Sequence, residues 1–240
     1  MYSAKEYYEI VRKNIKDVFE RIYFSYDRTR GKIWSELMDY IVRIEPDRYI
    51  IDLGAGTGRY SLVLARSHRV LAVDVAYNMC KVTLRKAKRR KLDANLDVIV
   101  ADILSLPLRD NIAKGILLIA VLHHIPYNMF RRKVLEDVVR VGVKGGIVVI
   151  TVWSRYQPRH IVRVISTYLT GRALEIGDAY VKWRHMGRTL KRYYHLFSKG
   201  ELRRLVSSIN GLTIERIYTM KLRSKYFPQN YVCVAVVNKC

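Results

Sequence analysis

The sequence predicts an α/β fold in which a mainly parallel sheet is covered by helices on both faces. Between residues 48 and 153, short apolar runs alternate with segments whose apolar side chains recur at helical spacing. This alternation is typical of parallel strands joined by crossover helices. The first apolar run, residues 49–54, ends in a glycine-rich turn of the kind that leads a strand into a helix.

The elements are expected in a regular order along the chain. Helices are indicated by 3.6-residue periodicity at residues 2–24, 32–44, 78–91, 128–142 and 198–208, with a polar, basic loop at 25–31. Strands are indicated at residues 49–54, 69–74, 96–102, 114–122, 146–153, 212–222 and 230–237. The last two strands have no helix between them, which predicts an antiparallel C-terminal hairpin at the edge of a seven-stranded sheet.

We expect a single domain of four consecutive parts. Residues 154–195 break the alternation, because they are rich in Arg, His and Tyr and poorly periodic, and they are interpreted as an insertion. The parts are a helical cap at residues 1–45, a core at 46–153, the basic insertion at 154–195, and a helix with a hairpin at 196–240.

Charge is the unusual feature of the composition. The 240 residues include 44 Lys and Arg against 21 Asp and Glu, a formal net charge of +23. Such an excess attracts polyanions such as RNA and DNA, although a solvated basic surface is the alternative interpretation.

Cysteine content and hydropathy indicate the cellular compartment in which the protein is expected. Cys80, Cys233 and Cys240 form no CxxC motif or Cys/His cluster, so neither a disulfide framework nor a metal site is expected. No apolar run approaches the roughly 20 residues that a membrane span needs. We therefore expect a soluble, unprocessed cytoplasmic protein without a membrane contact.

The glycine turn and two acidic strand ends predict a cofactor site. Glycines at 54, 56 and 58 let the backbone approach a ligand at the carboxyl edge of the sheet. Asp74 ends the next strand, where a carboxylate can accept both hydroxyls of a ribose. A dinucleotide site is the competing interpretation, but the pattern here is GxGxG, and the preceding Asp52 would repel a phosphate.

The sequence D-x-G-x-G-x-G at residues 52–58 resembles the first motif of class I S-adenosylmethionine-dependent methyltransferases, which have a Rossmann-like fold. The resemblance implies that Asp74 binds the ribose and that Asp102 with Ile103 binds the adenine of S-adenosylmethionine. Asp52 has a second interpretation, as a residue that caps the helix entry or bonds its backbone. The remaining residues implied at the cofactor are Tyr26, Gly54, Ala55, Gly56, Gly58, Val75 and Ala120.

Four further fragments resemble the wobble-uridine tRNA carboxymethyl methyltransferases, including the methyltransferase domain of the AlkB-homologue type. The fragments are TRGKIW at 29–34, VADILSLP at 100–107, AVLHH at 120–124 and RYYHLFSKGEL at 192–202. The resemblance implies esterification of 5-carboxymethyluridine in the tRNA anticodon loop. It also implies a small zinc-binding activator subunit that pairs with the strand from Leu96 to Val100. The family usually has an aromatic residue and a proline where Gly31 and Ile33 stand here.

The chemistry of a carboxylate acceptor narrows the catalytic candidates. A carboxylate is already ionised near neutral pH, so methyl transfer needs positioning groups and no general base. Arg30, His124, Tyr193 and His195 are the candidates for this role. Each has a competing interpretation: a phosphate contact or solvated charge for Arg30, packing at the strand end for His124, and hinge packing for the other two.

Other methyl acceptors are less compatible with the residues after the fourth strand. Amino-methylating enzymes of nucleic acids place an Asn or Asp there, followed by two prolines and an aromatic residue, and this chain does not. No cysteine is well placed to attack pyrimidine C5. The insertion interleaves basic and aromatic residues, which favours contact with an RNA loop. A small-molecule methyltransferase, acting on a quinone or lipid, and a non-catalytic RNA-binding protein are the rival interpretations.

Overall fold

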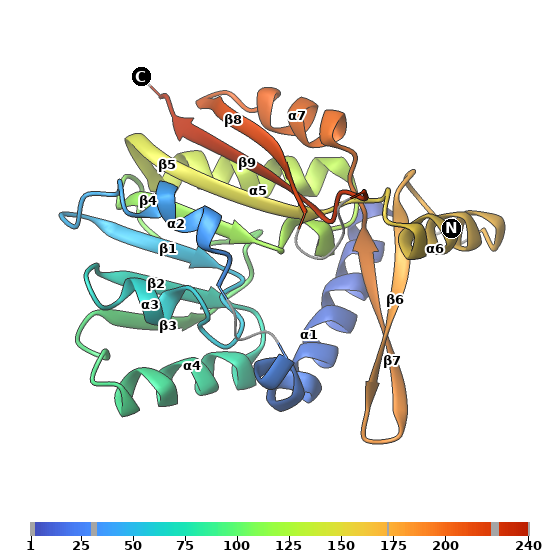
Figure 1. Ribbon diagram of the computed structural model, residues 1–240, viewed down its shortest axis with the longest axis horizontal. Helices are drawn as coiled ribbons and strands as arrows, with labels where there is room; N and C mark the ends of the chain where they lie inside the picture. The colour runs from blue at the N-terminus through green and yellow to red at the C-terminus, as the bar shows by residue number, and fades with distance from the viewer. Residues whose placement is uncertain (1–2, 30–32, 172, 222–225, 240) are drawn as a thin grey trace.

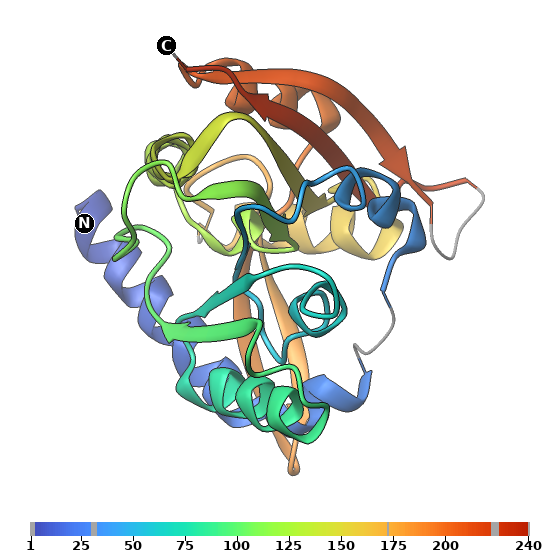
Figure 2. The same cartoon turned by 90° about the vertical axis from the view of Figure 1, so that its left-hand side faces the viewer.

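The computed structural model describes residues 3–29, 33–171, 173–221 and 226–239 of the chain. In this part, seven strands form one sheet in the order β3-β2-β1-β4-β5-β9-β8, so that β3 and β8 are its edges (Figures 1 and 2). β1 to β5 are parallel, and β9 and β8 run antiparallel to their neighbours. The strands are β1 (Tyr49–Leu53), β2 (Val70–Asp74), β3 (Leu96–Val100), β4 (Ala113–Ile119), β5 (Gly142–Trp153), β8 (Leu212–Met220) and β9 (Asn230–Val237). The predicted seven-stranded sheet with an antiparallel C-terminal hairpin is confirmed.

Helices cover both faces of the sheet, as the alternation predicts. Side chains that alternate along each strand enter two separate cores, because successive residues of a strand point to opposite faces. In β1, Ile51 packs on the face covered by α5 (Asn128–Val141) and α7 (Lys199–Ser207). Ile50 packs on the other face, which is covered by α2 (Ser35–Ile41), α3 (Ser61–Leu64) and α4 (Tyr77–Arg89).

The first helix, α1 (Ala4–Thr29), is longer than the sequence predicts. The polar loop expected at residues 25–31 is helical as far as Thr29, and residues 30–31 lie outside the described residues. The hydroxyl groups of Ser25 and Thr29 donate to backbone carbonyls one turn earlier, so these polar side chains are compatible with a helix. In the described part of the chain, no helix has both the length and the apolar surface that crossing a bilayer requires.

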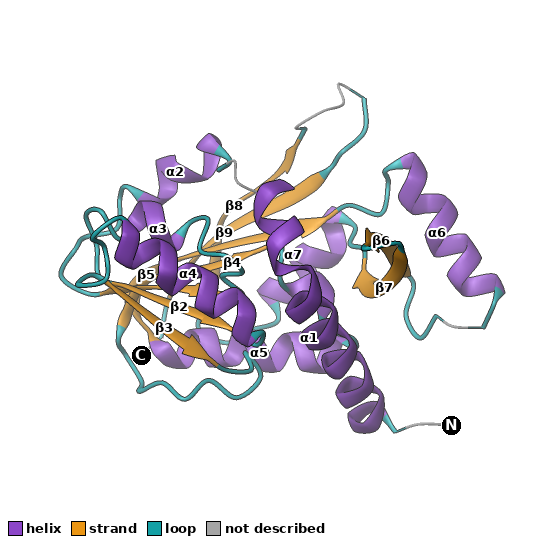
Figure 3. Ribbon diagram, turned by 90° about the horizontal axis from the view of Figure 1, so that it is seen from below, coloured by secondary structure: helices purple, strands orange, loops and turns teal. Residues whose placement is uncertain are grey.

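The segment interpreted as an insertion contains regular secondary structure in its described residues. It consists of α6 (Pro158–Leu169) and a hairpin of β6 (Asp178–His185) and β7 (Arg188–His195). Met186 and Gly187 both have positive φ at the hairpin tip, as a tight two-residue turn requires. The hairpin lies beside α1, and α6 covers its outer side (Figures 1 and 3). Its inner end is buried on both faces, so the period-two pattern of an ordinary strand is absent there.

The fourth strand is shorter than the sequence predicts. It ends at Ile119, and residues Leu122–His124 form a 3-10 turn, η1, instead of continuing the strand. Ala120, at the break, has a φ of +61°. The residues up to 122 are therefore apolar because this turn is buried in the core, and not because they continue the strand.

Candidate active site

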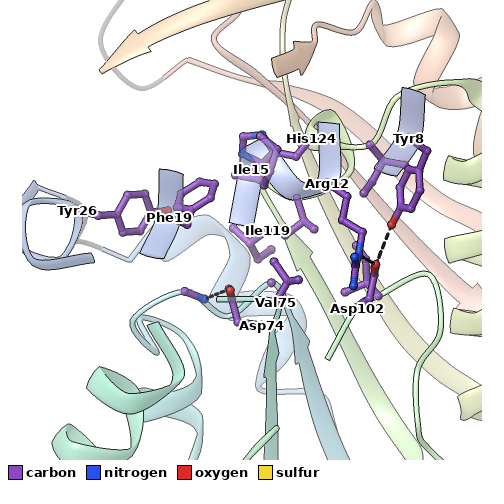
Figure 4. A pocket seen from close by; sticks show the side chains of 16 residues that line it. Tyr8, Arg12, Ile15, Phe19, Tyr26, Asp74, Val75, Asp102, Ile119 and His124 are labelled. Carbon is purple, nitrogen blue, oxygen red and sulfur yellow. Dashed lines mark hydrogen bonds and ion pairs between the residues drawn. The ribbon is translucent and has the colours of Figure 1, made fainter. Parts of the chain in front are cut away.

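A pocket opens at the carboxyl ends of β1, β2 and β4, where the predicted cofactor residues meet (Figure 4). This edge of an open α/β sheet is where ligands bind, because the loops that follow parallel strands leave a crevice there. Eight residues assigned from the sequence line the pocket: Tyr26, Gly54, Gly56, Asp74, Val75, Asp102, Ile103 and Ala120. His124, from the catalytic set, lines it as well.

One wall of the pocket comes from α1, of which the sequence assigns only Tyr26 to the site. Its lining residues recur at intervals of three, four or seven positions and therefore share one face of the helix. They are Tyr8, Arg12, Ile15, Phe19 and Tyr26. The helical periodicity of α1 could have identified this face, but not that a ligand pocket lies beneath part of it.

The glycine turn serves two purposes. Gly54 has a φ of +69°, and a Cβ atom there would lie 2.5 Å from Cγ2 of Val121. Gly56 also has positive φ, and a Cβ atom there would lie 3.5 Å from Cε1 of Tyr26. Gly58 does not line the pocket: a Cβ there would lie 2.6 Å from Cγ2 of Thr83, so its role is close packing on α4.

Asp74 stands at the end of β2 with both carboxylate oxygens held by backbone. Oδ2 accepts a hydrogen bond from Gly56 N at 2.8 Å, and Oδ1 accepts one from Ala76 N at 2.9 Å. The side chain opens onto the pocket, yet the carboxyl group lies deep, and burial raises its pKa to about 6. Each oxygen keeps a free lone pair for a ligand hydroxyl.

Asp52 is 3% exposed and bonds Ser61 at the start of α3. Its Oδ2 accepts from Ser61 N at 3.2 Å and from Ser61 Oγ at 2.6 Å. Burial raises its pKa to about 6. These contacts match the helix-entry role. Together with Ala55, Asp52 also lines a smaller cavity beside the main pocket, which shares Tyr26 and Gly54 with it.

Asp102 connects α1 to the far end of the pocket. The hydroxyl of Tyr8 donates to its Oδ2 at 3.0 Å, and Leu104 N donates to its Oδ1 at 3.0 Å. Arg12 forms an ion pair with the same carboxylate (Figure 4). The helix that forms the pocket wall is thus attached at the residue predicted to bind adenine.

His124 is positioned by the insertion. Its Nδ1 lies 3.1 Å from the carbonyl oxygen of Tyr193, which can only accept, so Nδ1 carries the proton. Burial, and next the charge of Arg192, lower its pKa to about 3. The imidazole is therefore neutral at physiological pH, and its Nε2 offers a lone pair.

Tyr193 and His195 belong to a buried ionic network and do not line the pocket. The Tyr193 hydroxyl donates to Asp178 Oδ1 at 2.6 Å. His195 bridges Asp178 at 2.9 Å and Glu201 at 2.5 Å through its two ring nitrogens. Burial lowers the pKa of His195, but these two carboxylates outweigh it and the pKa is raised. The structure thus does not bring these two side chains to the pocket, and Arg30 lies outside the described residues.

Two arginines complete this network, in which Glu175, Asp178 and His195 also have the spacing of metal ligands. Arg131, only 1% exposed, pairs with Glu175 at 2.7 Å. Arg155 pairs with Glu201. The carboxylates of this cluster accept from arginine, histidine and tyrosine donors, while Nε of Arg131 is buried without a hydrogen-bond partner among the described residues.

Comparison with known proteins finds a matching family model, similar proteins and a matching fold. The family described as a methyltransferase domain matches residues 51–150. A tRNA (carboxymethyluridine(34)-5-O)-methyltransferase of Arabidopsis thaliana is 32% identical over 155 residues, which are 65% of this chain and 36% of that protein. The protein of the same name from Schizosaccharomyces pombe is 26% identical over 224 residues, 88% of this chain and 93% of that protein.

Among solved structures, a SAM-dependent methyltransferase from Methanosarcina mazei matches with a TM-score of 0.73 at 19% identity, covering 86% of this chain and 99% of that one. At that identity the match shows the fold, and the predicted Rossmann-like class I fold is confirmed. The resemblance to the tRNA carboxymethyl methyltransferases is confirmed by the two relatives. This chain spans about a third of the Arabidopsis protein and nearly all of the S. pombe protein.

Proposed function

We propose that this chain methylates tRNA with S-adenosylmethionine, since residues 51–150 match the methyltransferase domain family and the chain has the class I fold. The acceptor in this proposal is the carboxylate of 5-carboxymethyluridine at the wobble position. The observation that carries it is the meeting of Gly54, Asp74 and Asp102 in one pocket. The acceptor is suggested by the two relatives, whose similarity to this chain extends beyond the cofactor core.

The pocket residues fit the cofactor at each of its parts. Gly54 and Gly56 leave room beside the methionine part, where a side chain on Gly56 would project toward Tyr26. The free lone pairs of Asp74 suit the two ribose hydroxyls, and Asp102 with Ile103 lies at the adenine end. Ala55, Val75 and Ala120 complete this set, while Asp52 and Gly58 act through the packing of the turn. The cofactor supplies an electrophilic methyl group on a sulfonium.

The residues around His124 support an acceptor that is already ionised. A neutral imidazole with its Nδ1 proton held by Tyr193 is a poor partner for a carboxylate, so another group must supply positive charge. Cys80 cannot act as a C5 nucleophile, because burial raises the pKa of its thiol to about 12. The chain therefore has to orient the acceptor oxygen and exclude water; no deprotonation step is needed.

The β6–β7 hairpin presents the surface proposed to contact the tRNA. Lys182 and Lys191 are exposed and directly opposite each other in the two strands. Like charges at such positions repel, and no ion pair to a described carboxylate relieves them. Arg184 and Arg188 are exposed toward the hairpin tip. Binding of a phosphate backbone would remove this repulsion.

The partner subunit and the location are the finer parts of the proposal. β3 is an edge strand, and Val100 at its end is 48% exposed, so its outer edge can pair with a strand of a zinc-binding activator. Full activity of the chain alone would remove this part of the proposal. With tRNA as the substrate, we place the reaction in the cytoplasm.

The test is transfer of labelled methyl from S-adenosylmethionine to bulk tRNA, followed by mild alkali. Label that enters tRNA and leaves as methanol would establish an ester and hence a carboxylate acceptor. Label that resists alkali would keep a tRNA methyltransferase and reject the carboxymethyl acceptor. No transfer, even with an activator present, would favour a small-molecule substrate or an RNA-binding protein without catalysis.

A further inference from the structure

We propose that Arg192 is the cation that receives the carboxylate of the methyl acceptor, a role that rests on the proposed function. Arg192 lies in β7 and is only 2% exposed. Its Nε is buried without a hydrogen-bond partner, and its guanidinium forms no hydrogen bond or ion pair with any residue that the structure describes. A buried cation without an anion is costly, so a binding partner from outside the chain is expected to neutralise it.

Aromatic rings hold the guanidinium in place, but they do not provide acceptors for its hydrogen bonds. Its central carbon lies 4.8 Å from the ring centre of Trp183, 5.3 Å from that of Tyr194 and 5.6 Å from that of Phe19. Cation–π contacts stabilise the charge through the faces of these rings, but they leave the N–H groups without acceptors. A planar guanidinium offers two parallel N–H groups that match the two oxygens of a carboxylate.

A second unpaired donor lies beside it. The indole Nε1 of Trp183 is also buried without a hydrogen-bond partner among the described residues. Trp183 and Arg192 belong to paired strands, two residues apart in register, and their side chains are in contact. Two adjacent orphan donors of this kind suit an anion with two acceptor oxygens better than a neutral group.

The position of Arg192 links this anion site to the cofactor pocket. Phe19, which contacts the guanidinium, lines the pocket, and so does His124, whose ring lies 5.4 Å from that of Phe19. Trp183 packs on Tyr26, another lining residue, at 6.3 Å between ring centres. The guanidinium therefore contacts the α1 wall of the pocket through Phe19. Because His124 presents only a lone pair, Arg192 and not His124 supplies the positive charge at this end.

The experiment measures binding of two anticodon stem-loop RNAs that differ in one group. One carries 5-carboxymethyluridine at the wobble position, and the other carries 5-carbamoylmethyluridine, which has the same shape without the charge. We expect the unmodified chain, with its activator where required, to bind the carboxymethyl loop about tenfold more tightly, since one charge-assisted bidentate contact is worth about that much. Arg192→Met is expected to abolish this preference.

The control is Arg66→Met, which removes the same charge from an exposed residue between α3 and β2. Arg66 precedes β2, so it lies near the amino ends of the parallel strands and away from the pocket at their carboxyl ends. It should keep the preference. Affinity for S-adenosylhomocysteine reports whether each variant folds. Where Arg192→Met lacks that affinity, Arg192→Lys is the second variant, and we expect a preference reduced several-fold by loss of the guanidinium fork.

The outcomes separate this proposal from the proposed function. A folded Arg192→Met or Arg192→Lys protein that prefers the carboxymethyl loop as strongly as the unmodified chain would overturn the role of Arg192 alone. An unmodified chain without any carboxylate preference, whose methylated tRNA resists alkali, would overturn both. Loss of the preference with S-adenosylhomocysteine binding intact would support Arg192 as the residue that recognises the charge.

Discussion

The carbonyl oxygen of Tyr193 accepts a hydrogen bond from Nδ1 of His124 at 3.1 Å, and this contact joins the insertion to a residue that lines the pocket. The YYHLF fragment therefore reaches the site through the backbone of Tyr193 and through the ring of Tyr194, whose centre lies 4.4 Å from that of His124. The side chains of Tyr193 and His195 turn the other way, into the network around Asp178. A fragment can therefore be characteristic of one group of enzymes although the polar side chains of Tyr193 and His195 do not line the pocket.

Cofactor binding is expected to weaken in mild acid because of Asp74. Its pKa, raised to about 6 by burial, means that the carboxylate gains a proton as the pH falls through that value. A protonated group is a poorer acceptor for two ribose hydroxyls, so S-adenosylhomocysteine affinity should fall between pH 7.5 and pH 5. Isothermal titration calorimetry measures it. Asp74→Asn should bind weakly and lack this pH dependence; a flat profile for the unmodified chain would contradict the assignment.

Replacement of Gly54 by alanine should affect the site beyond backbone strain. The residue has a φ of +69°, and the new Cβ would lie 2.5 Å from Val121. Gly145 provides a matched comparison, since its φ is +75° but no atom lies within 4 Å of a Cβ there. Both variants should lose about 1–2 kcal/mol of unfolding free energy from the left-handed conformation. Only Gly54→Ala should also lose cofactor affinity, by about tenfold or more, as measured by calorimetry. Equal effects of the two variants on cofactor affinity would contradict the role assigned to the close approach of Gly54 and Val121.

His195 should stabilise the fold more in mild acid than in alkali. Its pKa is raised above the ordinary value of 6.5, so the folded state holds the proton more tightly than the unfolded state. The stabilisation is therefore complete below about pH 6.5 and is lost as the pH rises through the raised pKa. The difference in unfolding free energy between the unmodified chain and His195→Gln should be about 1–3 kcal/mol at pH 6 and smaller at pH 9.

Urea denaturation at several pH values measures this difference. His185→Gln is the control, because His185 lies at the hairpin-tip end of β6 and forms no ion pair among the described residues. It should show no comparable pH-dependent difference. A His195→Gln difference that grows toward pH 9 would show that the histidine is neutral in the folded protein.

The hairpin cations should determine the salt dependence of tRNA binding. Lys182 and Lys191 face each other without an acidic partner, and each phosphate contact releases about one counterion. The double variant Lys182→Met, Lys191→Met should bind tRNA more weakly and lower the slope of log affinity against log salt by about 1.5–2. Filter binding at roughly four salt concentrations, from about 50 to about 300 mM, measures this slope.

Lys88→Met with Arg89→Met on α4 is the matched comparison for this experiment. Both residues are exposed and belong to a basic run at residues 85–91. This pair should leave the slope unchanged. A larger effect from α4 than from the hairpin would move the tRNA surface to the other side of the pocket.

The fold and the cofactor half of the site could be predicted because their signals are local. The turn at residues 52–58, Asp74 and Asp102 each follow a short apolar strand, and the carboxyl ends of parallel strands meet at one edge whatever the helices do. The acceptor half could not be predicted in the same way. A helix with several aromatic and apolar faces gives no indication of which face covers a pocket, and Tyr26 is the only residue of α1 that the sequence assigns to the site.

By itself, the sequence determined the parallel sheet, the position of the cofactor turn and the acidic strand ends, since periodicity and glycine content specify them residue by residue. The tertiary structure alone decided what the motif RYYH does. In a β-strand, neighbouring side chains point to opposite faces, so packing of the hairpin between α1 and α6 sends Tyr193 and His195 to the ionic network and Arg192 into a cluster of aromatic rings. Burial without a partner is a property of that packing, and no pattern in the sequence carries it.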